Sequence, residues 1–270
     1  MRRVTIKELR LRDYRAFADA RLVLDDVTFL VGRNGTGKTT VMDAFAFVSE
    51  AVADSLMTAL ERRGGLEGIC RRYPASGAPS DVSIAVVLET EDSRRDKPLL
   101  YGFTLGKEPA IPGSLVKREV LQAAGGAAAR AGRVAQFERV RNEFQSARRD
   151  LHPVLDGETL VFPLIAGASE VGKLIAEALR RISVYQLSPR AIRSEPKIGS
   201  ESRPSRDGHN AGDILGQLTA DDHRWLDTHL AAAISGLRGV PRPRAGESAS
   251  SSGTRAKAAS TSCATPSERI

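Results

Sequence analysis

A glycine-rich phosphate-binding motif is the feature of this sequence that most restricts its fold. Residues 32–39 read Gly-Arg-Asn-Gly-Thr-Gly-Lys-Thr and satisfy the P-loop pattern G-x-x-x-x-G-K-[ST] at every fixed position. The glycines permit a tight loop whose backbone N–H groups surround phosphate oxygens. The Lys38 ammonium can reach the β- and γ-phosphates of a nucleotide, and the Thr39 hydroxyl can bind Mg²⁺. The motif therefore predicts a site for a magnesium-bound nucleoside triphosphate.

The sequence on both sides of this loop fits the same interpretation. Residues 27–31, Val-Thr-Phe-Leu-Val, are apolar and rich in β-formers, which predicts a buried strand leading into the loop. Between residues 40 and 63, apolar residues recur at intervals of three and four, which predicts a helix whose positive end faces the phosphate. Gly64 and Gly65 then provide a natural C-terminal stop.

Several further strands are predicted from alternating or continuous apolar runs. Residues 4–14 alternate with one slip in period between Ile6 and Leu9, and residues 21–24 form a second short strand. Three runs separated by short polar, Gly or Pro connections predict an antiparallel meander: 82–89, 99–105 and 115–121.

The remainder of the chain reads as helices and loops. Helices are predicted over residues 123–149, 171–181, 211–218 and 220–237, a strand over 182–187, and loops over 74–80 and 194–208. From residue 241 onward the sequence has no apolar periodicity and is rich in Ser, Ala, Arg and Pro. Such a segment cannot bury enough apolar surface to offset the entropy of ordering, so we expect disorder.

Composition favours a globular protein of the cytoplasm. Hydrophobic residues make up 41% of the 270 residues, and no run approaches the roughly 20 apolar residues of a membrane span. The N-terminus carries no apolar secretory segment. Cys70 and Cys263 form no metal-spaced pair and indicate no disulfide framework. A cytoplasmic location without a membrane partner is the resulting expectation.

The net charge of +7 raises the question of nucleic-acid binding. Residues 241–270 contribute +3 of it, and Arg outnumbers Lys by 32 to 8, a bias typical of GC-rich coding. No helix-turn-helix, zinc-finger or RNA-binding signature is present in the sequence. Direct contact with DNA therefore stays a minor alternative.

The N-terminal residues resemble a known family of ATPases. Asp13-Tyr14-Arg15 ends the first strand, and Phe-Leu-Val-Gly-Arg-Asn-Gly-Thr-Gly-Lys-Thr-Thr occupies residues 29–40. This pattern resembles the RecF/SMC-like branch of ABC-type ATPases, the AAA-domain predicted ATPases that include the OLD-family nucleases. A looser similarity covers residues 207–210 and the helix after them.

The resemblance implies an α/β fold: an ABC-like P-loop NTPase head with an antiparallel β meander and a helical segment. It implies ATP and Mg²⁺ as ligands, hydrolysis of ATP, and Arg15 near the nucleotide, whereas a surface role at a strand end is the alternative for Arg15. It leaves open a homodimer through the nucleotide site and a DNA, repair or anti-phage-defence partner. The nucleotide-binding residues predicted in this way are Gly32, Asn34, Gly35, Thr36, Gly37, Lys38, Thr39, Thr40 and Arg15, with Thr39 as the metal ligand.

The sequence lacks a clear catalytic half. Hydrolysis in such ATPases needs a Walker B strand that ends in Asp-Glu and a Ser-Gly-Gly-type signature. Residues 22–26 and 85–89 imitate a Walker B but are better explained as strand ends. Residues 167–174 imitate a second P-loop but are better explained as a capped helix start. Gln122 and Gln186 are weak candidates for an ATP-sensing glutamine. The catalytic residues are therefore unknown, and we expect very low turnover.

These observations predict an incomplete ATPase domain. Residues 1–239 are interpreted as the N-terminal part of an ABC-like head, and residues 240–270 as a disordered, frameshifted tail. A missing strand would leave an apolar sheet edge, which favours marginal stability and capture of a partner. The alternative function is a non-catalytic, nucleotide-dependent interaction module. A kinase or GTPase is disfavoured because no acceptor site or Asn-Lys-x-Asp motif is present.

Overall fold

The fold is built around one antiparallel sheet. The computed structural model describes residues 4–72, 81–90, 98–107, 115–123, 136–146, 150–193 and 203–233, and the predicted tail and the predicted loop over 74–80 lie outside these ranges. The chain divides into two units, Met1–Val184 and Tyr185–Ile270, which are described separately.

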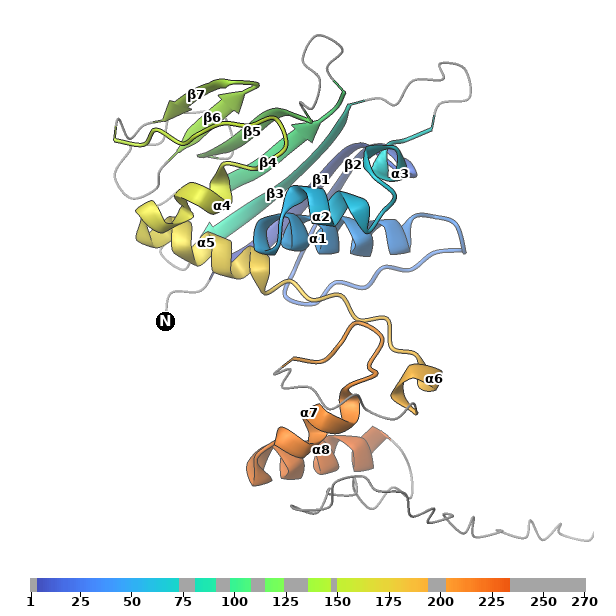
Figure 1. The fold of residues 1–270 in the computed structure, drawn as a ribbon. Helices are drawn as coiled ribbons and strands as arrows, with labels where there is room; N and C mark the ends of the chain where they lie inside the picture. Colours follow the sequence, from blue (N-terminus) through green and yellow to red (C-terminus); the bar gives the residue numbers. More distant parts are fainter. Residues whose placement is uncertain are drawn as a thin grey trace, which may run out of the picture. The chain divides into compact units, whose positions relative to one another are not determined.

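Seven strands of the first unit pair in the order β2-β1-β3-β4-β5-β6-β7 (Figure 1). Every neighbouring pair is antiparallel. The strands are β1 Val4–Tyr14, β2 Phe17–Val23, β3 Val82–Thr90, β4 Leu99–Leu105, β5 Val116–Ala123, β6 Phe137–Val140 and β7 Glu143–Ser146. The predicted meander is confirmed as β3, β4 and β5. A mixed α/β fold with an antiparallel sheet is compatible with an ATPase domain.

The slip in the period of β1 appears as a change of register. The pairing of β1 with β3 shifts between Ile6 and Glu8. Such a shift moves the following residues by one position, so that Leu9 and Leu11 enter the core. Glu8 is buried on the opposite face, where Arg10 and Arg21 pair with its carboxylate.

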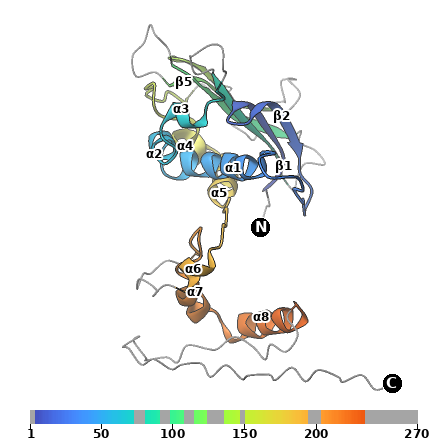
Figure 2. The same ribbon diagram turned by 90° about the vertical axis from the view of Figure 1, so that its right-hand side faces the viewer.

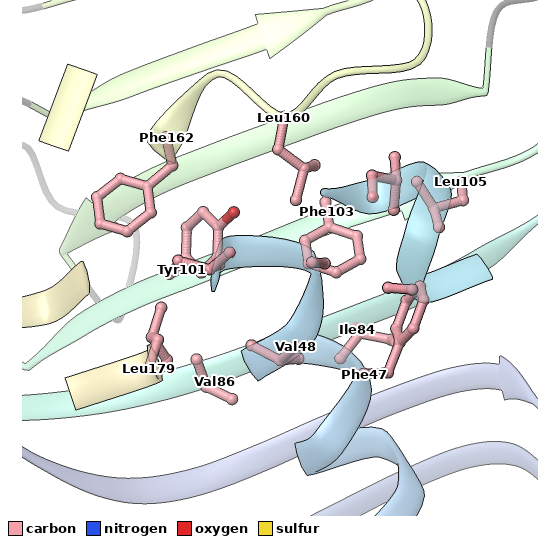
Figure 3. Packing of buried hydrophobic residues seen from close by; sticks show 14 of the residues in the cluster. Phe47, Val48, Ile84, Val86, Tyr101, Phe103, Leu105, Leu160, Phe162 and Leu179 are labelled. Carbon is pink, nitrogen blue, oxygen red and sulfur yellow. The ribbon is translucent and has the colours of Figure 1, made fainter. Parts of the chain in front are cut away.

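Helices cover one face of the sheet (Figures 1 and 2). They are α1 Lys38–Ala53, α2 Leu56–Glu61, α3 Leu66–Ile69, α4 Phe162–Ile165, the short 3₁₀ turn Ala166–Ala168 and α5 Glu170–Arg180. Phe47 and Val48 of α1 lie against residues of β3 and β4, including Ile84 and Phe103, in the core that Figure 3 shows. The rings of Phe47 and Phe103 meet edge to face at a centroid distance of 6.0 Å.

The prediction of one continuous helix over residues 40–63 is wrong in one respect. The helix breaks at Asp54, and Ser55 caps α2 by accepting a hydrogen bond from the Thr58 N–H at 3.0 Å. A serine hydroxyl that bonds the backbone in an extended conformation favours a helix start over a helix interior. The stop at Gly64 and Gly65 is confirmed, since both have a φ of +80°.

The helix predicted over residues 123–149 is also wrong. Of this range the structure describes residues 123 and 136–146, which belong to β5 and to the hairpin of β6 and β7. Alternation decides the outcome, because Phe137 and Arg139 face the core while Val140 is exposed. The ring of Phe137 stacks with those of Phe144 and Phe162. These contacts across strands outweigh the helical preference of the surrounding Ala and Arg.

Later predictions are partly confirmed. The helix over 171–181 is α5, and those over 211–218 and 220–237 are α7 Ala211–Gln217 and α8 Ala220–Ala233, followed by residues outside the described ranges. The strand predicted over 182–187 is wrong, because these residues form no ladder in the described structure. The second unit also contains α6 Pro189–Ile192. Of the loop predicted over 194–208, residues 203–208 are described and are irregular.

A buried carboxylate, Glu119, attaches the segment before α4 to the sheet. The Glu119 carboxylate accepts hydrogen bonds from the Val161 and Phe162 N–H groups at 2.5 and 2.9 Å and from the Tyr101 hydroxyl at 3.1 Å. Arg139 lies opposite Glu119 in the neighbouring strand and is equally buried. Burial raises the pKa of Glu119, and the two N–H donors oppose that rise.

We predict that Glu119→Ala destabilises the fold by about 3–5 kcal/mol, because it leaves three donors, the Val161 and Phe162 N–H groups and the Tyr101 hydroxyl, without their acceptor. Glu138→Ala is the matched control, since this half-exposed residue of β6 pairs with Arg118 at the surface and its loss costs at most about 1 kcal/mol. Urea unfolding of both variants measures the difference. Similar midpoints for the two variants would contradict the structural role of Glu119.

Candidate functional site

The glycine-rich motif forms a loop that opens directly into α1. Gly35 and Gly37 have φ values of +82° and +95°, and Gly37 is the residue before the first helical turn. The first backbone bond of the turn runs from the Val41 N–H to the Gly37 carbonyl at 3.0 Å. The N–H groups of residues 38–40 therefore precede any acceptor within the helix and are available to an anion at its positive end.

Gly37 is fixed by its neighbour as well as by its backbone angles. A Cβ atom at this position would lie 2.5 Å from the ring of Phe17, the first residue of β2. The ring thus rests directly on the beginning of α1. This contact requires glycine and ties the loop to the β1–β2 turn.

Lys38 holds the loop in a curled shape. Its Nζ donates to the carbonyls of Gly32 and Arg33 at 2.6 and 2.7 Å. The Thr36 hydroxyl donates to the Arg33 carbonyl at 2.9 Å. The ammonium therefore sits within the loop that the motif predicts. Asn34 and Thr39 are exposed, and Thr40 is half-buried.

The segment before the loop differs from the prediction. Residues 27–31 form no strand, and in the part of the chain that the structure describes no strand pairs with them. Leu30 packs against the core, whereas Val27, Phe29 and Val31 are 71%, 83% and 93% exposed. An apolar run becomes a strand only where another strand satisfies its backbone groups. The missing ladder is the physical reason for the difference.

Arg15 lies in the turn between β1 and β2 with a φ of +47°. Its Nη1 is 3.1 Å from the Asp43 Oδ2 of α1, and its Nε donates to the Gly68 carbonyl at 3.2 Å. The side chain is thus attached to the helix that follows the phosphate loop. Both roles considered for Arg15, a position near the nucleotide and a surface position at a strand end, stay predictions.

A cluster of five polar side chains surrounds this contact, here called the Asp43 cluster. Asp43 accepts a hydrogen bond from the Tyr14 hydroxyl at 2.6 Å and one from the Arg63 Nε at 3.1 Å. Arg63 is 4% exposed at its side chain and also donates to Glu50 at 2.7 Å. The members of the cluster are Tyr14, Arg15, Asp43, Glu50 and Arg63.

The surroundings in the Asp43 cluster keep Tyr14 protonated and Arg63 charged. Burial raises the pKa of Tyr14, and its hydrogen bond to Asp43 raises it further, so the hydroxyl remains a donor. Burial opposes the charge of Arg63, yet hydrogen bonding to Glu50 and the charge of Asp43 raise its pKa overall. Sequence reasoning missed Asp43 and Arg63. The sequence contains one indication of Asp43: it lies four residues before Phe47 and therefore on the same, apolar face of the helix.

The segments that imitate further ATPase motifs lie in ordinary helix and strand ends. Residues 167–174, which imitate a second P-loop, run from the 3₁₀ turn into the start of α5, where the Ser169 side chain accepts a hydrogen bond from the Gly172 N–H at 2.9 Å. That interpretation as a capped helix is confirmed. Residues 25–26 follow the end of β2, and Glu89 lies near the end of β3. Among the described residues, no group of three or more His, Cys, Asp and Glu side chains could hold a metal ion.

Comparison with known proteins supports the nucleotide interpretation. Residues 5–92 match the family model described as an AAA ATPase domain. The match spans β1 to β3 and includes the phosphate loop, Arg15 and Asp43. It supports an AAA-type ATPase with a nucleotide-binding function. No curated protein matches the chain. Within the described ranges, the helices are too short or too polar to cross a membrane.

We predict that Gly37→Ala disrupts the loop far more than Gly35→Ala. Both residues have positive φ, which costs an L residue about 1–2 kcal/mol. Only at Gly37 does the new methyl group also collide with Phe17, whereas nothing lies within 4 Å of a Cβ at Gly35. Thermal unfolding should show the larger decrease in Tm for Gly37→Ala. Equal decreases would mean that the Phe17 contact does not constrain the loop.

Proposed function

We propose that this chain binds ATP with Mg²⁺ through residues 32–40 and Arg15, as the ATP-binding part of an ATPase of the RecF/SMC-like type. The observation that carries the proposal is the loop geometry. Two left-handed glycines lead into the positive end of the 16-residue helix α1, and the loop surrounds the Lys38 ammonium. The match to an AAA ATPase domain covers this same region.

Each loop residue has a distinct role in this proposal. Backbone N–H groups at the start of α1 donate to phosphate oxygens. Lys38 exchanges two short hydrogen bonds to loop carbonyls for bonds to the β- and γ-phosphates, so its ammonium is never without acceptors. The exposed Thr39 hydroxyl fits a hard cation such as Mg²⁺, which when bound neutralises phosphate charge. Arg15 supplies a guanidinium as a second cationic donor group beside the Lys38 ammonium.

The exposed apolar segment points to a larger assembly. Three large apolar side chains of this segment are exposed to water together, which is typical of an interaction surface: Val27, Phe29 and Val31. We infer that residues 27–31 are a segment on which a further strand can pair. The similarity to RecF/SMC-like proteins is the support for a dimer through the nucleotide site and for a role in DNA repair or anti-phage defence.

A non-catalytic interaction module is the second candidate function. The observation that favours it is a formed phosphate loop in a sequence where the two segments that imitate a Walker B motif, residues 22–26 and 85–89, belong to the ends of β2 and β3. In that case ATP is a ligand that controls association. Lys38-dependent phosphate release would exclude this second candidate, because a non-catalytic module does not hydrolyse ATP.

We predict that Lys38→Ala weakens Mg-ATP binding by at least tenfold, because the variant loses a charge-assisted contact to phosphate. Isothermal titration with Mg-ATP measures the affinity. Lys173→Ala is the matched control, since Lys173 occupies the lysine position of the imitation motif and pairs with Glu170 at the surface. Equal affinity of the Lys38 variant and the wild-type chain would disprove the site. Phosphate release by the chain alone is expected to be negligible in all three proteins.

We also predict that Phe29→Ser combined with Val31→Thr reduces self-association of the chain, because it removes two exposed apolar side chains from one segment. Val154→Ser, at a residue that is 89% exposed elsewhere in the first unit, is the control and should change nothing. Sedimentation velocity over a range of concentrations measures both. If the double variant associates as strongly as the wild-type chain, residues 27–31 are not an association surface.

A further inference from the structure

Two contacts hold the Arg15 side chain, and its guanidinium has further N–H donors. Its Nη1 pairs with Asp43 at 3.1 Å, and its Nε donates to Gly68 at 3.2 Å. Within the described residues no hydrogen bond or ion pair engages its Nη2, and a third of the side chain is exposed. A guanidinium carries five N–H donors in a rigid fork, so two fixed contacts determine where the remaining donors lie.

The turn that carries Arg15 runs along the beginning of α1. Phe17, two residues further on, touches Gly37 at the start of the helix. Asp43, which holds Arg15, lies five residues after Lys38, about 7.5 Å along the helix axis. The guanidinium therefore lies beside the first turns of α1, on the element that presents the phosphate loop.

Asp43 is itself fixed by groups other than Arg15. Its Oδ1 accepts from Arg63 at 3.1 Å, and its Oδ2 accepts from Tyr14 at 2.6 Å. Arg63 has a second acceptor in Glu50 at 2.7 Å. The two arginines of the cluster are thus balanced by two carboxylates. Asp43 is only 7% exposed, and a carboxylate with this burial and these partners has one well-defined orientation.

We propose that Asp43 is the positioning residue for Arg15 in the nucleotide site: it orients the guanidinium so that its free donors bind a phosphate oxygen of ATP. The inference rests on the proposed function, because it requires phosphate at the loop. Asp43 touches no phosphate in this scheme. It lowers the entropic cost of binding by holding a flexible arginine in advance.

The direction in which one substitution changes the affinity for Mg-ATP distinguishes a positioning role of Asp43 from a purely electrostatic one. Asp43→Asn removes a negative charge near a site for a polyanion, so through-space electrostatics alone predicts tighter binding of Mg-ATP. Positioning predicts the reverse, because asparagine is a weaker anchor for Arg15. We expect Asp43→Asn to weaken Mg-ATP binding about three- to tenfold, and Arg15→Ala to weaken it about tenfold. Asp54→Asn, at the other end of α1, is the matched control for loss of an aspartate and should leave the affinity unchanged.

A double-mutant cycle then tests whether Asp43 acts through Arg15. In the Arg15→Ala background, Asp43→Asn should cause little further loss of Mg-ATP affinity, which a general effect on the fold would not produce. Tyr14→Phe is a gentler second variant, since it removes only the hydroxyl that fixes Asp43. It should weaken binding about two- to threefold, again only when Arg15 is present. Circular dichroism and Tm identify variants that fail to fold, and Tyr14→Phe carries the test if Asp43→Asn is among them.

The outcomes are distinguishable from a failure of the proposed function. If the wild-type chain shows no Lys38-dependent binding of Mg-ATP, the nucleotide site itself is wrong. If that binding is present, the inference is overturned by tighter binding in Asp43→Asn, by an unchanged affinity in Arg15→Ala, or by equal losses from Asp43→Asn with and without Arg15. A loss that depends on Arg15 supports it.

Discussion

The packing of α1 against the antiparallel sheet is the constraint on which the phosphate loop depends. Phe47 and Val48 anchor the helix in the core, and the Phe17 ring lies against the glycine at its N-terminus. A helix fixed along its length has a fixed N-terminal end, so the backbone N–H groups there are aimed before any ligand arrives. The loop is therefore positioned by residues that do not belong to the motif.

The Asp43 cluster adds specificity to this apolar packing. A buried carboxylate is costly unless several donors satisfy it, and Asp43 has three partners from three segments: Tyr14 from β1, Arg15 from the following turn and Arg63 from the turn after α2. Rotation of α1 about its axis would break all three contacts together. Apolar contacts alone tolerate such a rotation much better, since they have little directionality. The cluster thus sets the rotational position of the helix that carries the loop.

The parts of the fold that could be predicted from sequence are those determined locally. Alternation identified β1, including its slip near Ile6, and the glycine spacing identified the loop. The failures have non-local causes. Residues 136–146 form a hairpin because Phe137 and Arg139 have partners in other parts of the fold. Helix propensity does not take such contacts into account. Asp43 was missed because its importance comes from Arg63, which is adjacent to it only in space.

The two sides of the phosphate loop are held very differently. Downstream, Gly37 is fixed by Phe17 and by the first bond of α1. Upstream, Leu30 packs on the core while Val31 is almost fully exposed. The upstream end nevertheless supplies the Gly32 and Arg33 carbonyls to which Lys38 donates. Under the proposed function, a strand that paired with residues 27–31 would fix these carbonyls, and phosphate would compete with them for the same ammonium. Strand pairing and phosphate binding would then be linked reciprocally, because each changes the free energy of the conformation that the other requires.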